Sequence, residues 1–153
     1  MRGLWLAALA RDLLQVAFSG TALVPDLTLL VLVWLSVFRC DEAEPIFINA
    51  FLAGILWDLR WTAVPGMTSA AYSLTVAATA WLWSNLPPGR RANPALFFCW
   101  ATVAHLMTSF FPAIFTSRAL GFSSSLATQQ GMAVACVLGL TALYIRHRRT
   151  HHE

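Results

Sequence analysis

Six apolar segments of helix length follow one another along this chain, and this pattern limits the possible folds more than any other feature. The segments cover residues 3–22, 24–40, 46–61, 67–86, 94–115 and 125–145. A helix that crosses a bilayer needs about 20 mostly apolar residues, with a working range of about 17–25. The connections, such as "PPGRRANP", are short and contain helix breakers. The sequence therefore predicts an all-α fold, a polytopic helical bundle with six transmembrane helices, and residues 1–153 form one integral membrane domain.

The composition excludes an ordinary water-soluble domain. Of the 153 residues 58% are hydrophobic and only 11% are charged, whereas a soluble domain has about a quarter of its residues charged. Tryptophans cluster near predicted helix ends, where their amphipathic rings favour the lipid head-group layer. We therefore expect these rings to contact membrane lipids, and we expect no nucleic acid among the partners.

Arginine placement predicts the orientation, because the chain contains no lysine. One side of a six-span arrangement receives seven arginines, which are Arg2, Arg39, Arg90, Arg91, Arg146, Arg148 and Arg149. The other side receives two, Arg60 and Arg118, and Arg11 lies inside the first segment. Since positive charge favours the cytoplasmic side, both termini are expected in the cytoplasm.

The stretch "FLAGILWDLRWTAVPG", residues 51–66, places Asp58 at the end of an apolar segment. A carboxylate there meets the unfavourable end of the helix dipole, which costs about 0.3–1 kcal/mol when exposed, so it needs a partner. The candidates are Arg60, Arg118 and the backbone N–H groups that open the next helix at 66–68, where Gly66 permits close approach. We interpret Asp58 as a clamp that holds the 60–66 loop on that helix start. A contact with a partner protein and a small-molecule site stay open as alternatives.

Arg11, Asp12 and His105 are further polar residues within the apolar segments, where each is a functional candidate by default. Arg11 and Asp12 are neighbours in the first segment and form either a locally neutralised pair or a contact with a partner. His105 stands alone in "FFCWATVAHLMTSFF" and is interpreted as a hydrogen-bonded packing residue.

Small residues recur every four positions in the sixth segment. They are Ala127, Gly131, Ala135 and Gly139. Such a stripe lets two helix backbones approach closely in lipid. It serves either the internal bundle or the helix of a partner.

No pattern of catalytic, cofactor-binding or metal-binding residues stands out in the sequence. Ser123 in "GFS" and His105 would suit an intramembrane serine hydrolase only weakly, because that serine lies in a serine-rich loop. HExxH, P-loop and dinucleotide-binding patterns do not occur. The sequence therefore predicts a protein that is not an enzyme and needs no cofactor.

Several of these residues occur in the order and spacing of a known family. "LLQ" at 13–15 is followed by Pro25 and Asp26, which open the second segment. Gly54 and Asp58 then end the third segment, and Pro65 and Gly66 precede the fourth. In this order, over about residues 13–80, the chain resembles the MreD family of rod shape-determining membrane proteins. The family commonly continues its Asp with Ser-Gly, whereas this chain has "LRWTAVPG".

The resemblance implies a non-enzymatic scaffold or regulator in the bacterial inner membrane. MreD-like proteins bind MreC, a single-span partner, in the rod complex that directs lateral peptidoglycan synthesis and cell shape, together with peptidoglycan synthases. The family is also similar in fold to the substrate-binding subunits of energy-coupling-factor transporters. A small-molecule-binding subunit of such a transporter is therefore the alternative function.

Overall fold

The computed structural model describes residues 1–18, 24–39, 42–62, 64–91, 93–115 and 124–150, and their regular secondary structure is entirely helical. The helices are α1 (Arg2–Ala17), α2 (Leu27–Phe38), α3 (Ala43–Trp61), α4 (Met67–Asn85), α5 (Pro88–Arg91), α6 (Pro94–Phe115) and α7 (Ser124–Thr150). The predicted all-α class is confirmed, and each of the six predicted segments overlaps one of the long helices.

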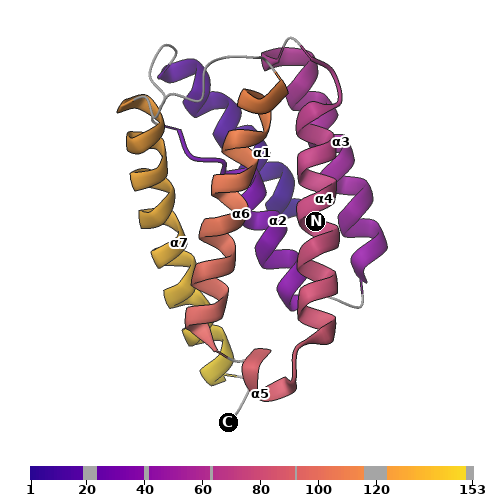
Figure 1. Cartoon of the computed structure of the whole chain (residues 1–153), viewed down its shortest axis with the longest axis vertical. Helices are drawn as coiled ribbons and strands as arrows, with labels where there is room; N and C mark the ends of the chain where they lie inside the picture. The colour runs from indigo at the N-terminus through magenta and orange to yellow at the C-terminus, as the bar shows by residue number, and fades with distance from the viewer. Residues whose placement is uncertain (19–23, 40–41, 63, 92, 116–123, 151–153) are drawn as a thin grey trace.

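The long helices alternate in direction, and α4, α6 and α7 follow the long axis of the molecule, whereas α1 crosses the bundle obliquely (Figure 1). α5 is a single turn between α4 and α6. The closest neighbours are α3 with α4, α6 with α7, and α1 and α4 with α2. The fold is thus an up-and-down bundle in which α2 contacts the helices of both halves.

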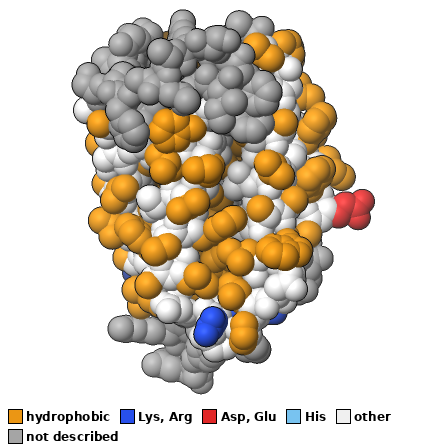
Figure 2. Space-filling model, in the orientation of Figure 1, with side chains coloured by type: hydrophobic (Ala, Val, Ile, Leu, Met, Phe, Trp, Pro, Cys, Tyr) orange, Lys and Arg blue, Asp and Glu red, His pale blue; other side chains and the backbone are white. Residues whose placement is uncertain are grey.

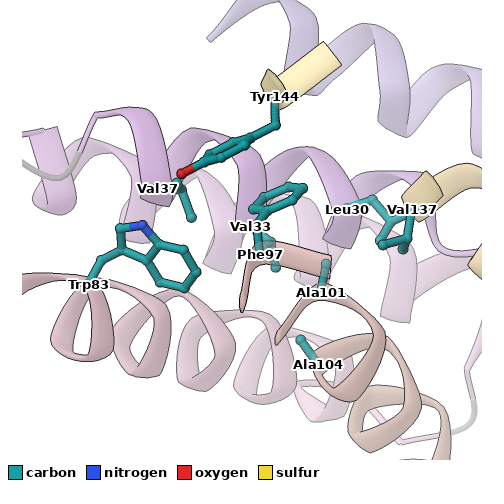
Figure 3. Packing of buried hydrophobic residues seen from close by; sticks show 9 residues of the cluster. All are labelled: Leu30, Val33, Val37, Trp83, Phe97, Ala101, Ala104, Val137 and Tyr144. Carbon is teal, nitrogen blue, oxygen red and sulfur yellow. The ribbon is translucent and has the colours of Figure 1, made fainter. Parts of the chain in front are cut away.

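α2 lies at the centre because it is apolar around its whole circumference, as a buried helix must be. Leu30, Val33 and Val37 pack in one core cluster with side chains of α4, α6 and α7, and Figure 3 shows this cluster. Leu29 and Leu32 pack in a second cluster with side chains of α1, α3 and α4. The two clusters hold the bundle together from opposite sides of one short helix.

Among the helix starts, two differ by three residues from the predicted segments, and among the ends α1 stops at Ala17 and α7 continues to Thr150. α2 begins at Leu27 and not at residue 24, because Pro25 favours extended backbone in the preceding residue and Asp26 is the N-cap. α3 begins at Ala43, three residues before the predicted start. There Pro45 is tolerated in the first turn, and Glu44 faces the favourable end of the helix dipole.

Large apolar side chains cover the outside of the described bundle. Leu59, Trp81 and Leu6 are 72%, 69% and 65% exposed. Figure 2 shows hydrophobic side chains spread over the visible face, with few charged groups among them. Extended exposed apolar surface of this kind is typical of a contact with a membrane or a partner protein.

By length and mean hydropathy, one segment of the described residues, Ala127–His147, is suited to cross a membrane. Leu27–Phe38 and Pro94–Phe110 are apolar but shorter. α1 has only 16 residues, and α3 carries Glu44, Asp58 and Arg60. The finding weakly supports a membrane location, and the six-span arrangement stays an expectation.

The small-residue stripe of α7 faces outward. Ala127, Gly131, Ala135 and Gly139 are all exposed, and a Cβ added at Gly131 or Gly139 would meet no described atom within 4 Å. α7 packs on the bundle through another face, with Val137 and Tyr144 fully buried. Of the two alternatives left open for the stripe, packing inside the described bundle is therefore excluded, and a partner's helix stays open. A period of four residues alone does not say which side of a helix faces inward.

Gly54 is the point of closest approach between α3 and α4. A Cβ at this position would lie 2.5 Å from the Ser69 backbone nitrogen, well inside van der Waals contact. The Ser69 hydroxyl also donates to the Phe51 carbonyl at 2.9 Å. The absent side chain thus sets the distance between the two helices, and α4 begins close enough to reach Asp58.

We expect Gly54→Ala to destabilise the protein by about 1–3 kcal/mol or more, because the Ser69 backbone cannot move away without separating the helices. Gly131→Ala is the matched control. It should be neutral or stabilising by up to about 1 kcal/mol, since the new methyl group meets open space in a helix. Denaturation of the purified variants in mild detergent, followed by circular dichroism, measures both. Equal stability of the two variants would contradict the assigned contact.

Candidate functional site

The Asp58 carboxylate lies at the start of α4 and is 1% exposed. It accepts hydrogen bonds from Thr68 N at 2.9 Å and from Ser69 N at 3.3 Å. The Thr62 hydroxyl donates to the same carboxylate at 3.0 Å. Asp58 therefore gives α4 an N-terminal anion from another helix, where the dipole stabilises it.

Gly66 explains why this anion comes from α3. It is the N-cap of α4, and it has no side chain that could accept from the first turn. Its φ of 88° lies in the left-handed region that glycine tolerates best. Pro65 precedes it in the exposed turn. Of the three candidate partners of Asp58, the backbone N–H groups at the start of α4 are the ones that bind it. Arg60 binds Asp12 instead, and Arg118 lies outside the described residues.

Asp58→Asn should destabilise the protein by about 1–3 kcal/mol, because one oxygen becomes an amide that cannot accept from the α4 N–H groups. Glu44→Gln, the same change on the same helix at an exposed position, should cost less than about 1 kcal/mol. Thermal unfolding of both variants provides the comparison. An Asp58→Asn variant as stable as Glu44→Gln would show that the clamp contributes nothing.

The second polar centre is built around Asp26, the N-cap of α2. It meets α4 about one helical turn beyond the residues that bind Asp58. Its carboxylate caps α2 by accepting from Leu29 N at 3.0 Å. The Tyr72 hydroxyl of α4 donates to it at 2.7 Å. Arg11 of α1 forms an ion pair with it at 3.0 Å and also hydrogen-bonds Tyr72. One carboxylate thus joins α1, α2 and α4.

The backbone before α2 is buried without being helical, and side chains of α6 and α7 satisfy it. The Asp26 N–H donates to His105 Nε2 at 3.0 Å, so the other ring nitrogen carries the proton and donates to Gln130 at 3.1 Å. Gln129 donates to the Val24 carbonyl at 3.3 Å. Buried backbone polar groups need such partners. We call Arg11, Asp26, Tyr72, His105 and Gln130 the polar hub.

The hub is nearly closed to solvent. Arg11 and Asp26 are 9% and 6% exposed, and Tyr72 and His105 are fully buried. The Arg11 guanidinium also stacks on Trp57, with Cζ 3.5 Å from the ring centroid. Buried charges of opposite sign, each with further hydrogen bonds, are stable as a pair but costly when one is removed.

Arg11 and Asp12 do not neutralise each other as a local pair. Arg11 binds Asp26, and Asp12 accepts from Arg60 at 2.6 Å and from Trp61 at 2.7 Å. Sequence neighbours point to different sides of a helix, so each finds its partner on another helix. His105 is hydrogen-bonded and packed, as the sequence analysis interpreted it.

A cleft of about 430 Å³ lies beside the hub. α1 and α3 form its walls through residues such as Leu9 and Leu56, and Arg11, Thr28 and Tyr72 also line it. Its size and mostly apolar lining are those of a small-molecule site between bundle helices.

Arg11→Met and Asp26→Asn should each destabilise the protein by about 3–5 kcal/mol, because each leaves a buried partner group unpaired. The loss of unfolding free energy in the double variant should be smaller than the sum of the two single losses, by about 1–3 kcal/mol. Asn keeps the N-cap of α2. The control cycle uses the exposed pair Arg39 and Glu42, 3.1 Å apart, where we expect a coupling below about 1 kcal/mol. Additive effects at Arg11 and Asp26 would contradict the hub.

The predicted site residues fall into three groups. Asp26 belongs to the hub, and Pro25 lies in the buried backbone just before it. Gly54, Asp58, Pro65 and Gly66 lie at the joint between α3 and α4, and the small-residue stripe lies on the outer face of α7. Sequence reasoning missed Tyr72 and Gln130. The adjacent glutamines 129 and 130 in an otherwise apolar segment were the available signal.

None of the protein-family models, curated proteins and solved structures compared with this chain matches it.

Proposed function

We propose that the chain is a six-span protein of the bacterial inner membrane, with both termini in the cytoplasm. The support is its distribution of polarity, with charged residues paired inside and large apolar side chains outside. In a bilayer this arrangement satisfies both the buried polar groups and the lipid-facing surface.

Within that membrane setting, the proposed role is a non-enzymatic scaffold of the MreD type in the cell-elongation complex. The proposal is carried by the positions, in the bundle, of the residues that the chain shares with the MreD pattern. Asp26, Gly54 and Asp58 each make a contact between helices on which the bundle depends. A chain that keeps these joints keeps a fixed arrangement of helices, which is what a scaffold requires.

The scaffold binds an MreC-like single-span partner and, through the complex, peptidoglycan synthases. The outward stripe of α7 is one candidate face for the partner's helix, because small exposed residues allow close backbone contact in lipid. The other is a rim formed by the exposed Val64 and Pro65 in the turn after Asp58, which suits the part of a single-span partner that lies outside the membrane. Helix packing and rim contacts together would orient the partner without any turnover.

Affinity purification of the tagged chain from native membranes, with mass spectrometry, tests this role. We expect recovery of a single-span coiled-coil partner and of wall synthases. Gly131→Leu should lower partner recovery about tenfold by placing bulk on the stripe. Ala10→Leu, at an exposed position of α1, should leave recovery unchanged. Absence of both the partner and the synthases from the wild-type sample would refute the scaffold.

The second candidate is a small-molecule-binding subunit of an energy-coupling-factor-type transporter. The observation in its favour is the cleft, which contains three tryptophans and the charged residues Arg11, Asp12 and Arg60. Recovery of an ATPase pair in the same purification, or thermal stabilisation by an added vitamin, would support this function instead of the scaffold.

A further inference from the structure

The cleft between α1 and α3 has two ends that are crossed by polar bridges. At one end Trp5 Nε1 donates to Asn49 Oδ1 at 3.2 Å. At the other end Asp12 binds Arg60 and Trp61. Between the bridges, Ala8 and Ala53 leave space because their side chains are small. The result is an elongated space that lies along two helices.

The surface around this space is apolar, so a guest enters from hydrocarbon and not from water. Leu9 and Leu56 line the cleft and are 55% and 57% exposed. Leu13 and Leu52, on the same two helices, are 59% and 45% exposed. A guest that reaches the cleft through such a surface is itself largely apolar.

Charge is concentrated at one end of the cleft. The Arg60 side chain is 58% exposed and uses Nη1 for Asp12, and guanidinium carries five N–H donors in all. Of the charged residues that line the cleft, Arg11 is paired with Asp26 and Asp12 with Arg60. The remaining N–H groups of the exposed Arg60 side chain are therefore the cationic donors that can meet a guest. Trp61, next to Arg60, also lines the cleft, as expected where a membrane protein meets the head-group layer. This end therefore suits an anionic, hydrogen-bond-accepting head group.

We propose that the cleft binds one anionic phospholipid, with an acyl chain between α1 and α3 and the phosphate at Arg60. This inference rests on the proposed membrane location but not on the scaffold role. Lodged there, the lipid fills the space that the two helices leave between them. The chain then carries a lipid site on its lateral face, next to the polar hub.

Native mass spectrometry of the purified full chain in detergent tests the site. The probes are phosphatidylglycerol, phosphatidylcholine with the same chains, and palmitate. We expect one tightly retained phosphatidylglycerol on the wild-type protein and about tenfold weaker binding to Ala8→Phe, whose ring occupies the cleft. Ala10→Phe, on the same helix at an exposed position outside the lining, should bind like the wild type.

A second pair of variants covers a failure of Ala8→Phe to fold. Leu56→Gln puts a polar amide on the wall, and Leu59→Gln makes the same change on α3 outside the lining, at a residue that is 72% exposed. Only the former should weaken binding.

Three results would overturn the proposal. Equal lipid retention by Ala8→Phe and Ala10→Phe would exclude the cleft as the site. Equal retention of palmitate would assign the cleft to a free fatty acid. If Ala8→Phe binds lipid like the wild type but no longer recovers the single-span partner in the affinity purification, the cleft is assigned to a protein helix. A failed lipid test with the protein still in the membrane fraction leaves the proposed location intact, so the two failures are distinguishable.

Discussion

The Asp26 carboxylate is the interaction on which most of the bundle depends. It caps α2, pairs with Arg11 and accepts a hydrogen bond from Tyr72. The backbone N–H of Asp26 donates to His105. α2 is the central helix, so the cap fixes where that helix begins. Through these bonds the position of α2 is coupled to α1, α4 and α6. The hydrophobic clusters on either side of α2 then pack around a helix whose register is set by polar contacts.

The hub and the apolar exterior have a common physical explanation. A single charged group without its partner is very unfavourable in an apolar medium. The oppositely charged groups therefore stay paired inside the bundle. Apolar side chains on the outside are stable only where water is absent or a partner covers them. Both features follow if hydrocarbon surrounds the bundle. The joint at Gly54 and Asp58 belongs to the same design, because the buried Asp58 carboxylate binds the N–H groups at the start of α4.

The helices could be predicted because apolar runs between breakers are a local property of the sequence. The clamp at Asp58 could be proposed because the dipole argument involves residues only ten positions apart. The pairing of Arg11 with Asp26, and of Asp12 with Arg60, could not. It depends on which helix faces meet, and that is a property of the packed bundle. The direction of the Gly131 stripe was left open by the sequence for the same reason. Tyr72 could not be singled out for the same reason, because only the packed bundle brings its hydroxyl to Asp26.

Hydrogen exchange at the Asp26 amide, measured by NMR on the chain in lipid nanodiscs, tests the hub most directly. This amide precedes the first helical residue, so only His105 protects it within the described structure. We expect protection comparable to amides inside α4 and its loss in His105→Leu, with α4 amides unaffected. Rapid exchange at Asp26 in the wild-type protein, or unchanged protection in His105→Leu, would contradict the account.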